Sequence, residues 1–283
     1  MNDKKLISKK CYWKGFKAQK FVFEEKQAII VFPKLNAQKK LFVGNAICKK
    51  KCCKKSCEAT ANGVVESMTN TNCAKQAWVW RTEFFGAFDS VDIAMLKNGF
   101  CLVNLAISDL FGAPCATEIM ERFQQYITSE FGLSEKAILI GLSRGGLYAL
   151  HYAAKCARNV SALYLDAPVV DLKSWPFGLG KGVGSELDKG LSLKAFGYSS
   201  VEQYQDYLNA TMLALSKEKL PLVLVAGDSD KVVPYIENGI LLEELWTKIA
   251  APLKVIIKKG CDHHPHSLAD PAPIVEFLMT NKL

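Results

Sequence analysis

The sequence of this 283-residue chain predicts an α/β fold built on a mostly parallel, doubly wound sheet. From residue 77 onward, six short apolar runs follow one another, and amphipathic segments with helical periodicity separate most of them. Apolar runs without an alternating polar face are typical of strands that are buried on both sides. Hydrophobic residues make up 49% of the chain, which supports a large core and excludes a disordered or fibrous protein.

Two β-rich runs, at 16–25 and 27–33, come first and predict an antiparallel edge of the sheet, with Pro33 ending the second. The six later runs are predicted strands at 77–85, 100–107, 136–143, 160–168, 221–228 and 253–260. The clearest helical segments between and after them are 116–133, 145–159, 236–250 and 271–282.

We expect one domain over residues 1–283 with two unusual segments. Residues 45–75 are rich in Lys, Cys, Asn and Thr and lack periodicity, so they are predicted to be an insertion. Residues 168–219 separate two predicted strands, are Gly-rich at first and then helical. In a doubly wound sheet, such a long connection is expected to form a cap above the carboxyl ends of the strands.

The formal net charge of +8 is concentrated in two segments. Residues 1–20 carry +6 and residues 48–58 carry +4, so the rest of the chain is close to neutral. A basic tail (1–20) and a basic loop (48–58) on a near-neutral body are more typical of solvated segments than of a binding face, which argues against nucleic-acid binding. No uncharged apolar run approaches the roughly 18 residues that span a bilayer, and the N-terminal segment has no apolar signal region. We therefore expect a cytoplasmic protein.

Five of the ten cysteines lie between residues 48 and 73. Thiolates three or four residues apart can share a zinc ion, so a metal site is one interpretation of this segment. No histidine lies nearby, however, and the neighbouring lysines would repel a cation. We favour a reduced, Lys-rich surface insertion and assign no metal.

The strongest chemical signal is the pentapeptide from Gly141 to Gly145, which reads Gly-Leu-Ser-Arg-Gly. It follows a predicted strand and precedes a predicted helix, which is the context of a nucleophile elbow. The turn is too tight for side chains at the flanking glycines, and it presents the Ser143 hydroxyl to the crevice beside a helix N-terminus. The alternative is a Gly-rich turn that only packs a helix on a strand. The context favours Ser143 as a nucleophile.

A serine nucleophile needs a base, and the chain has four histidines. His151 lies within the helix that follows the elbow and is expected to have a structural role. The other three, His263, His264 and His266, follow the last predicted strand, where a histidine can reach the elbow. We predict that His263 is the base; the alternatives for this segment are a polar turn or adventitious metal binding.

The acid that orients the histidine is expected on the loop after the preceding strand, which contains Asp228 and Asp230. Both could instead cap a turn. We predict Asp230, because Ser143, Asp230 and His263 then follow in the order Ser, Asp, His that this kind of sheet uses. The oxyanion hole is expected to combine the Arg144 amide with that of Phe85.

Phe84 and Gly86 are alternative donors to the oxyanion, and core packing is the alternative role of the phenylalanines. Trp175 lies in the predicted cap region and is a candidate wall of the substrate pocket, with packing of the cap as the equal alternative. No cofactor is expected, and no metal is part of the predicted catalytic site.

The motifs W-V-W-R-x-x-F-F-G, G-x-S-R-G-G-L, D-A-P-V-x-D-x-K-S-W, G-D-x-D-x-V-V-P-x-x-E-N and H-H-P-H-S-L-x-D-P resemble those of the α/β-hydrolase superfamily. They are more closely similar to a bacterial esterase-like group near the prolyl-oligopeptidase-like branch. The resemblance covers residues 77–283 and implies triad chemistry more firmly than a substrate. Two departures are Asp262, where glycine usually precedes the first histidine, and the length of the 45–75 segment. The motifs occupy residues 78–86, 141–147, 166–175, 227–238 and 263–271.

The sequence therefore predicts a serine hydrolase that cleaves a small-molecule carboxylic ester, with a carbohydrate-linked acyl group as one substrate class. A peptidase of the prolyl-oligopeptidase-like type is the alternative enzyme, although we expect such an enzyme to need a further gating domain. A non-catalytic binding protein on the same scaffold is the alternative outside enzymes. The complete predicted triad argues against it.

Overall fold

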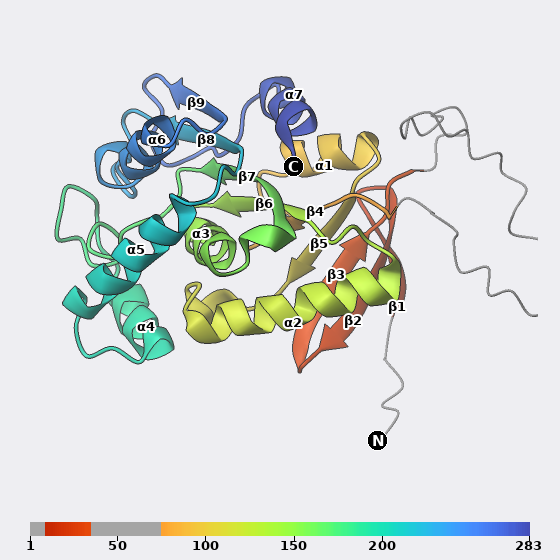
Figure 1. Ribbon diagram of the computed structural model, residues 1–283, viewed down its shortest axis with the longest axis horizontal. Helices are drawn as coiled ribbons and strands as arrows, with labels where there is room; N and C mark the ends of the chain where they lie inside the picture. The colour runs from red at the N-terminus through yellow and green to blue at the C-terminus, as the bar shows by residue number, and fades with distance from the viewer. Residues whose placement is uncertain (1–8, 35–74) are drawn as a thin grey trace, which may run out of the picture. The chain divides into compact units, whose positions relative to one another are not determined.

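The computed structural model describes residues 9–34 and 75–283, which contain a nine-stranded sheet and seven α-helices (Figure 1). The strands are β1 Lys9–Trp13, β2 Phe16–Phe23, β3 Lys26–Val31, β4 Trp78–Arg81, β5 Cys101–Leu105, β6 Ala137–Leu142, β7 Val160–Asp166, β8 Leu222–Gly227 and β9 Leu253–Lys258. The helices are α1 Ser90–Lys97, α2 Pro114–Phe131, α3 Gly145–Lys155, α4 Glu186–Phe196, α5 Glu202–Leu215, α6 Gly239–Lys248 and α7 Ala272–Asn281.

The strand order is β1-β2-β3-β5-β4-β6-β7-β8-β9. The first three strands pair antiparallel with one another, and β3 pairs antiparallel with β5. From β5 to β9 every pairing is parallel. The predicted α/β class, the parallel sheet and its antiparallel edge are thus confirmed.

Helices cover both faces of the parallel part of the sheet (Figure 1). One face packs against α1 and α7 through a cluster that includes Val91 and Ile274. The opposite face packs against α2, α3 and α6 through a larger cluster that includes Trp80, Phe123 and Trp246. Strands such as β6 and β7 are buried at every position, which explains why they are apolar without alternation.

The winding direction changes between the neighbouring strands β4 and β6. The chain leaves β4 toward α1 on one face and leaves β6 toward α3 on the other. The loops after these two strands therefore diverge at the carboxyl ends of the strands, which is where ligands bind in doubly wound sheets. The predicted nucleophile follows β6, and the predicted oxyanion loop follows β4.

Three elements were not predicted from the sequence. β1, Lys9–Trp13, lies within the Lys-rich segment 1–20 and pairs with β2, so these residues form an edge strand and not a solvated tail. The short helix α1 and the helix α4, within the 168–219 segment, were also missed. Residues 45–74 of the predicted insertion lie outside the described residues. Within the described ranges, no helix is both long and apolar enough to cross a bilayer.

Candidate active site

Ser143 lies in the turn between β6 and α3, and its backbone φ is +48°. Residues other than glycine rarely adopt this left-handed conformation, so the turn holds the serine in a strained geometry. The Ser143 amide donates to the Asp166 carbonyl at 2.9 Å, and the Ser143 carbonyl accepts from the Val169 and Gly146 amides, both at 2.9 Å. Backbone bonds to the end of β7 thus fix the elbow in place.

The glycines around Ser143 are required by close backbone contacts. A Cβ atom on Gly141 would lie 2.7 Å from the Gly145 carbonyl oxygen, and one on Gly146 would lie 2.6 Å from the Pro168 Cβ. Real Cβ atoms do not approach neighbours this closely. The Gly-x-Ser-x-Gly-Gly sequence therefore follows from the sharp reversal of the chain.

His263 lies on the loop after β9, and its ring connects the two other predicted groups. Its Nε2 is 2.9 Å from the Ser143 Oγ, and its Nδ1 is 2.8 Å from the Asp230 Oδ2. The carboxylate accepts a hydrogen bond from the Nδ1–H group, which leaves the Nε2 lone pair to accept the serine hydroxyl proton. Because the His263 side chain is only 7% exposed and that of Asp230 is 1% exposed, water scarcely competes for the bond between them.

Two backbone amides hold the Asp230 carboxylate in position on the loop after β8. The amides of Val232 and Val233 donate to its Oδ1 at 2.9 and 2.8 Å, which leaves Oδ2 for His263. Asp228, the other predicted candidate, is exposed and accepts from the Gly260 amide instead. The structure therefore brings Ser143, His263 and Asp230 together, while Asp228 fixes the loop.

Asp262 stands immediately before the predicted base and joins the two loops. Its exposed carboxylate accepts from the Lys231 amide at 2.9 Å and from the His263 amide at 2.8 Å. These two backbone hydrogen bonds lower the pKa of Asp262 below its ordinary value. Asp262, which stands where the resembling motifs usually have glycine, thus places its carboxylate beside the backbone of the histidine loop.

Sequence reasoning missed a second histidine–carboxylate pair next to the first. His266 Nδ1 lies 2.9 Å from the Asp166 Oδ1, and both side chains are buried. Burial is the largest single influence and raises the pKa of Asp166, but the hydrogen bonds from His266 and Tyr164 and the charges of His266 and Lys258 together lower that pKa below its ordinary value. A charged residue at the end of the otherwise apolar β7 was the only signal in the sequence for this pair.

The Arg144 side chain is held by two carboxylates. Glu83, on the loop after β4, contacts the guanidinium at 2.9 and 3.0 Å, and Asp188 of α4 contacts it at 3.1 Å. The guanidinium also lies over the rings of Phe84 and Phe111. Burial raises the pKa of Glu83 despite this partner. Arg144 thus links the elbow to the 168–219 segment, which the sequence did not suggest.

The two amides that we predicted for the oxyanion hole remain available. Among residues 9–34 and 75–283, neither the Arg144 amide nor the Phe85 amide donates a hydrogen bond. Phe85 itself packs against Trp13 of β1, with ring centroids 5.2 Å apart. Phe84 has a φ of +54°, so the loop turns sharply just before Phe85.

Trp175 lies in the connection between β7 and β8 and is half-buried. Its ring stacks on Phe111 at a centroid distance of 6.4 Å, and Phe111 in turn contacts the Arg144 guanidinium. The tryptophan is therefore separated from the elbow by a single aromatic ring. Its role as a pocket wall stays a prediction.

Comparisons of the fold identify solved structures that share this architecture. An acylaminoacyl peptidase from Pyrococcus horikoshii superimposes with a TM-score of 0.59 at 10% identity, over 98% of this chain and 42% of that protein. A puromycin-hydrolyzing peptidase from Mycobacterium tuberculosis gives 0.58 at 14% identity, over 89% of this chain and 36% of that protein. Dipeptidyl peptidase 4 from Porphyromonas gingivalis gives 0.57 at 12% identity, over 90% and 33%.

This chain thus spans about two fifths or less of the length of each of these peptidases. Neither the protein-family models nor the curated sequences give a match to it. At these identities the likeness concerns the fold, which agrees with the strand order, the nucleophile-elbow geometry and the sequence motifs. The chain has the α/β-hydrolase fold.

Proposed function

We propose that this protein is a serine hydrolase that cleaves carboxylic esters through an acyl-enzyme intermediate. The observation that carries the proposal is the continuous hydrogen-bonded series Ser143–His263–Asp230, with distances of 2.9 and 2.8 Å. Its three members come from loops after three different strands and meet at the carboxyl end of the sheet, beside the switch point. A structural cluster would have no need to strain the Ser143 backbone, whereas a nucleophile does.

In the first half of the reaction, the Ser143 Oγ attacks the ester carbonyl carbon while its proton moves to the His263 Nε2. The Asp230 carboxylate stabilises the resulting imidazolium. The Arg144 and Phe85 amides donate to the oxyanion of the tetrahedral intermediate. When the intermediate collapses, the carbon–oxygen bond to the alcohol breaks and the Nε2 proton passes to the departing alkoxide.

In the second half, water attacks the acyl-enzyme and gives its proton to the same Nε2. Collapse of the second intermediate breaks the bond between the acyl carbon and Ser143, and the proton returns to the serine oxygen. The products are a carboxylic acid and an alcohol. The chemistry uses no redox step, and the chain's own side chains carry every proton.

Peptide bond cleavage is the second candidate, since the three proteins described above are peptidases by name. The same residues could perform it, because only the leaving group differs. A small or carbohydrate-linked acyl ester is our preferred substrate, with Trp175 and the β7–β8 connection as its binding surface. The preference for an ester over a peptide comes from the resemblance of the motifs to an esterase-like group.

A matched substrate panel tests the proposal. p-Nitrophenyl esters of increasing acyl length, acetylated sugars and aminoacyl p-nitroanilides are compared by kcat/KM on the full chain. We expect turnover of esters that depends on Ser143 and exceeds that of the anilides. Faster turnover of the anilides would identify a peptidase, and no Ser143-dependent turnover of any member would contradict hydrolase activity on these substrate classes.

A further inference from the structure

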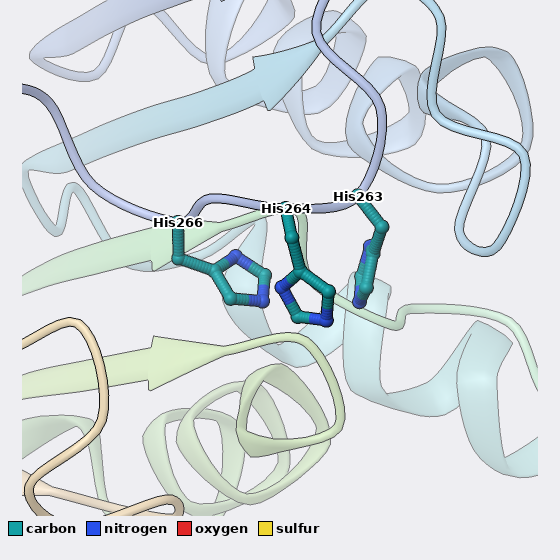
Figure 2. Close-up of side chains that lie close together, drawn as sticks. All are labelled: His263, His264 and His266. Atoms are coloured by element: carbon teal, nitrogen blue, oxygen red, sulfur yellow. The ribbon is translucent and has the colours of Figure 1, made fainter.

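Three imidazole rings lie against one another on the loop after β9 (Figure 2). The ring centroids of His263, His264 and His266 are 4.8 to 4.9 Å apart, so they form a nearly equilateral triangle. The planes of the rings are inclined at 61° to 90°. One nitrogen from each ring lies within 4.8 Å of the others. The predicted catalytic base is therefore one corner of a three-histidine cluster.

This spacing is wider than that of a tetrahedral zinc site, so the rings must approach one another to bind an ion. With zinc–nitrogen bonds of about 2.0–2.1 Å, neighbouring ligand nitrogens are roughly 3.4 Å apart. Closing the triangle therefore requires nitrogen movements on the order of 1 Å. His264 is exposed and lies beside the buried rings of His263 and His266, so it supplies the third ligand of the set. Three protein ligands also leave the fourth position to solvent.

The buried rings of His263 and His266 already have the supporting contacts that metal-binding histidines use. Asp230 accepts from the His263 Nδ1 and Asp166 from the His266 Nδ1. A carboxylate on the far nitrogen sets the tautomer and directs the Nε2 lone pair toward a metal. Asp166 is in turn held by the Tyr164 hydroxyl and the Ser267 amide, both at 2.7 Å.

The proposed hydrolysis explains the pair of His263 with Asp230 and leaves the pair of His266 with Asp166 without a role. Within residues 9–34 and 75–283, His266 Nε2 has no hydrogen-bond partner, although the residue is only 6% exposed. The Phe88 ring stacks on His264 at 5.3 Å and meets His266 edge-on at 5.1 Å. The His266 ring is thus oriented by Asp166, and its Nε2 has no protein partner in the described part of the chain and lies beside two further imidazoles, which makes it a candidate metal ligand.

We propose that His263, His264 and His266 bind one Zn²⁺ ion, and that the ion reversibly inhibits the hydrolase. Imidazole nitrogens select borderline transition metals such as Zn²⁺ and Co²⁺ over Mg²⁺ and Ca²⁺, which prefer oxygen. The inhibition rests on the proposed function: the ion occupies the Nε2 lone pair of His263, so the Ser143 proton has no acceptor. The binding itself does not depend on that function.

The binding test uses the full chain with Cys48, Cys52, Cys53, Cys57 and Cys73 replaced by serine, so that these thiols cannot take the metal. Co²⁺ is titrated and followed by the visible absorption of the tetrahedral ion, and Zn²⁺ is then added as a competitor. We expect one Co²⁺ per chain, displaced by Zn²⁺. His264→Ala and His266→Gln are each expected to weaken binding by about tenfold or more.

His151→Gln is the matched control, because this buried imidazole lies elsewhere, bonded to the Gly112 carbonyl and Tyr204. It should leave Co²⁺ binding unchanged. Circular dichroism verifies folding, and if His266→Gln does not fold, the exposed His264 carries the test alone. Co²⁺ binding that is absent, or that both cluster substitutions leave unchanged, would overturn the site.

The inhibition test measures the rate of ester hydrolysis with Zn²⁺, with Mg²⁺ and after chelation. For each variant, the rate with Zn²⁺ is divided by the rate after chelation. Zn²⁺ should inhibit the parent chain, chelation should restore it, and His264→Ala should bring the ratio close to one. Activity in the parent that Zn²⁺ leaves unchanged would overturn the inhibition. A chain that binds Co²⁺ at these histidines but hydrolyses no substrate would instead contradict the proposed function and leave the metal site standing.

Discussion

The Ser143 hydroxyl depends on an unfavourable backbone conformation. A non-glycine residue with φ near +48° costs on the order of 1–3 kcal/mol, which surrounding contacts must offset. Here the elbow is tied to the end of β7 by the bonds to Asp166 and Val169. The serine is thus held in place by the sheet before any substrate arrives.

Ser143→Ala is expected to lower kcat by a factor on the order of 10⁴–10⁶ while the fold is kept. The alanine retains the Cβ and the backbone bonds and loses only the oxygen that bonds to His263. Steady-state ester hydrolysis and thermal unfolding measure the two effects. Near-native turnover in the alanine variant would exclude Ser143 as the nucleophile.

Substitution of each of the three neighbouring histidines, assayed without metal, distinguishes their roles. His263→Ala should abolish turnover, because only this ring lies between Ser143 and Asp230. His264→Ala and His266→Ala should keep measurable turnover with chelator present. If instead His264→Ala or His266→Ala abolished turnover and His263→Ala kept it, the base would have to be reassigned.

Sequence reasoning identified site residues that directly follow predicted strands. It missed a side-chain pair that depends on how a strand end and a distant loop are arranged in space. Ser143, Asp230 and His263 each come directly after an apolar run, so their meeting could be inferred from parallel topology. The pairing of Asp166 with His266 joins residues 100 positions apart, and no local pattern encodes it.

Within the secondary structure, His151 connects helix α3 to helix α5 through a hydrogen bond to Tyr204. This ring is buried, its Nδ1 lies 2.9 Å from the Gly112 carbonyl, and its Nε2 lies 3.2 Å from the Tyr204 hydroxyl. Burial lowers the pKa of His151 to about 4. The expected structural role of this histidine agrees with these contacts.

A depressed pKa makes the helix pairing sensitive to acid. The unfolded chain takes up the His151 proton near its ordinary pKa, whereas the folded chain takes it up only near pH 4, so stability falls as the pH drops through this window. Between pH 7 and pH 5 the free energy of unfolding should fall by about 2 kcal/mol more in the parent than in His151→Gln. Urea unfolding at both pH values measures this, and equal losses in both chains would contradict it.

The elements that the sequence missed have weak local signals for physical reasons. β1 is a Lys-rich edge strand with little burial, and lysines on an edge discourage pairing with other chains. α4 carries Gly190 in its interior, which lowers helix propensity. The pairing of β1 with β2 and the ion pair between Asp188 and Arg144 supply what propensity lacks.

For the whole molecule, every residue of the proposed site lies between β4 and the loop after β9. The Lys/Cys-rich residues 48–73 contribute none of them, and they lie outside the described residues. The single-domain organisation with a 45–75 insertion and a 168–219 cap therefore remains a proposal. The contact of Arg144 with Asp188 supports the cap, because it places α4 beside the elbow.

Replacing residues 48–73 with a short Gly/Ser linker should leave turnover of a small ester close to that of the full chain. Loop length affects stability only weakly, by about 0.6 kcal/mol per doubling. Activity and zinc content are measured on both chains. The control is a full-length chain in which the cysteines of residues 48–73 are replaced by serine. Stoichiometric zinc that disappears with the segment, together with loss of folding, would show that the cysteines form a structural metal site.

The proposed reaction depends on Ser143 as a nucleophile that His263 activates. This role of Ser143 is tested most directly by reaction with a fluorophosphonate probe followed by mass spectrometry of the labelled peptide, because the probe reports the activated oxygen without knowledge of the substrate. We predict one label per chain on Ser143, which disappears in Ser143→Ala and is strongly slowed in His263→Ala. Absence of labelling in the folded chain, or a label on another residue that persists in Ser143→Ala, would contradict this role of Ser143.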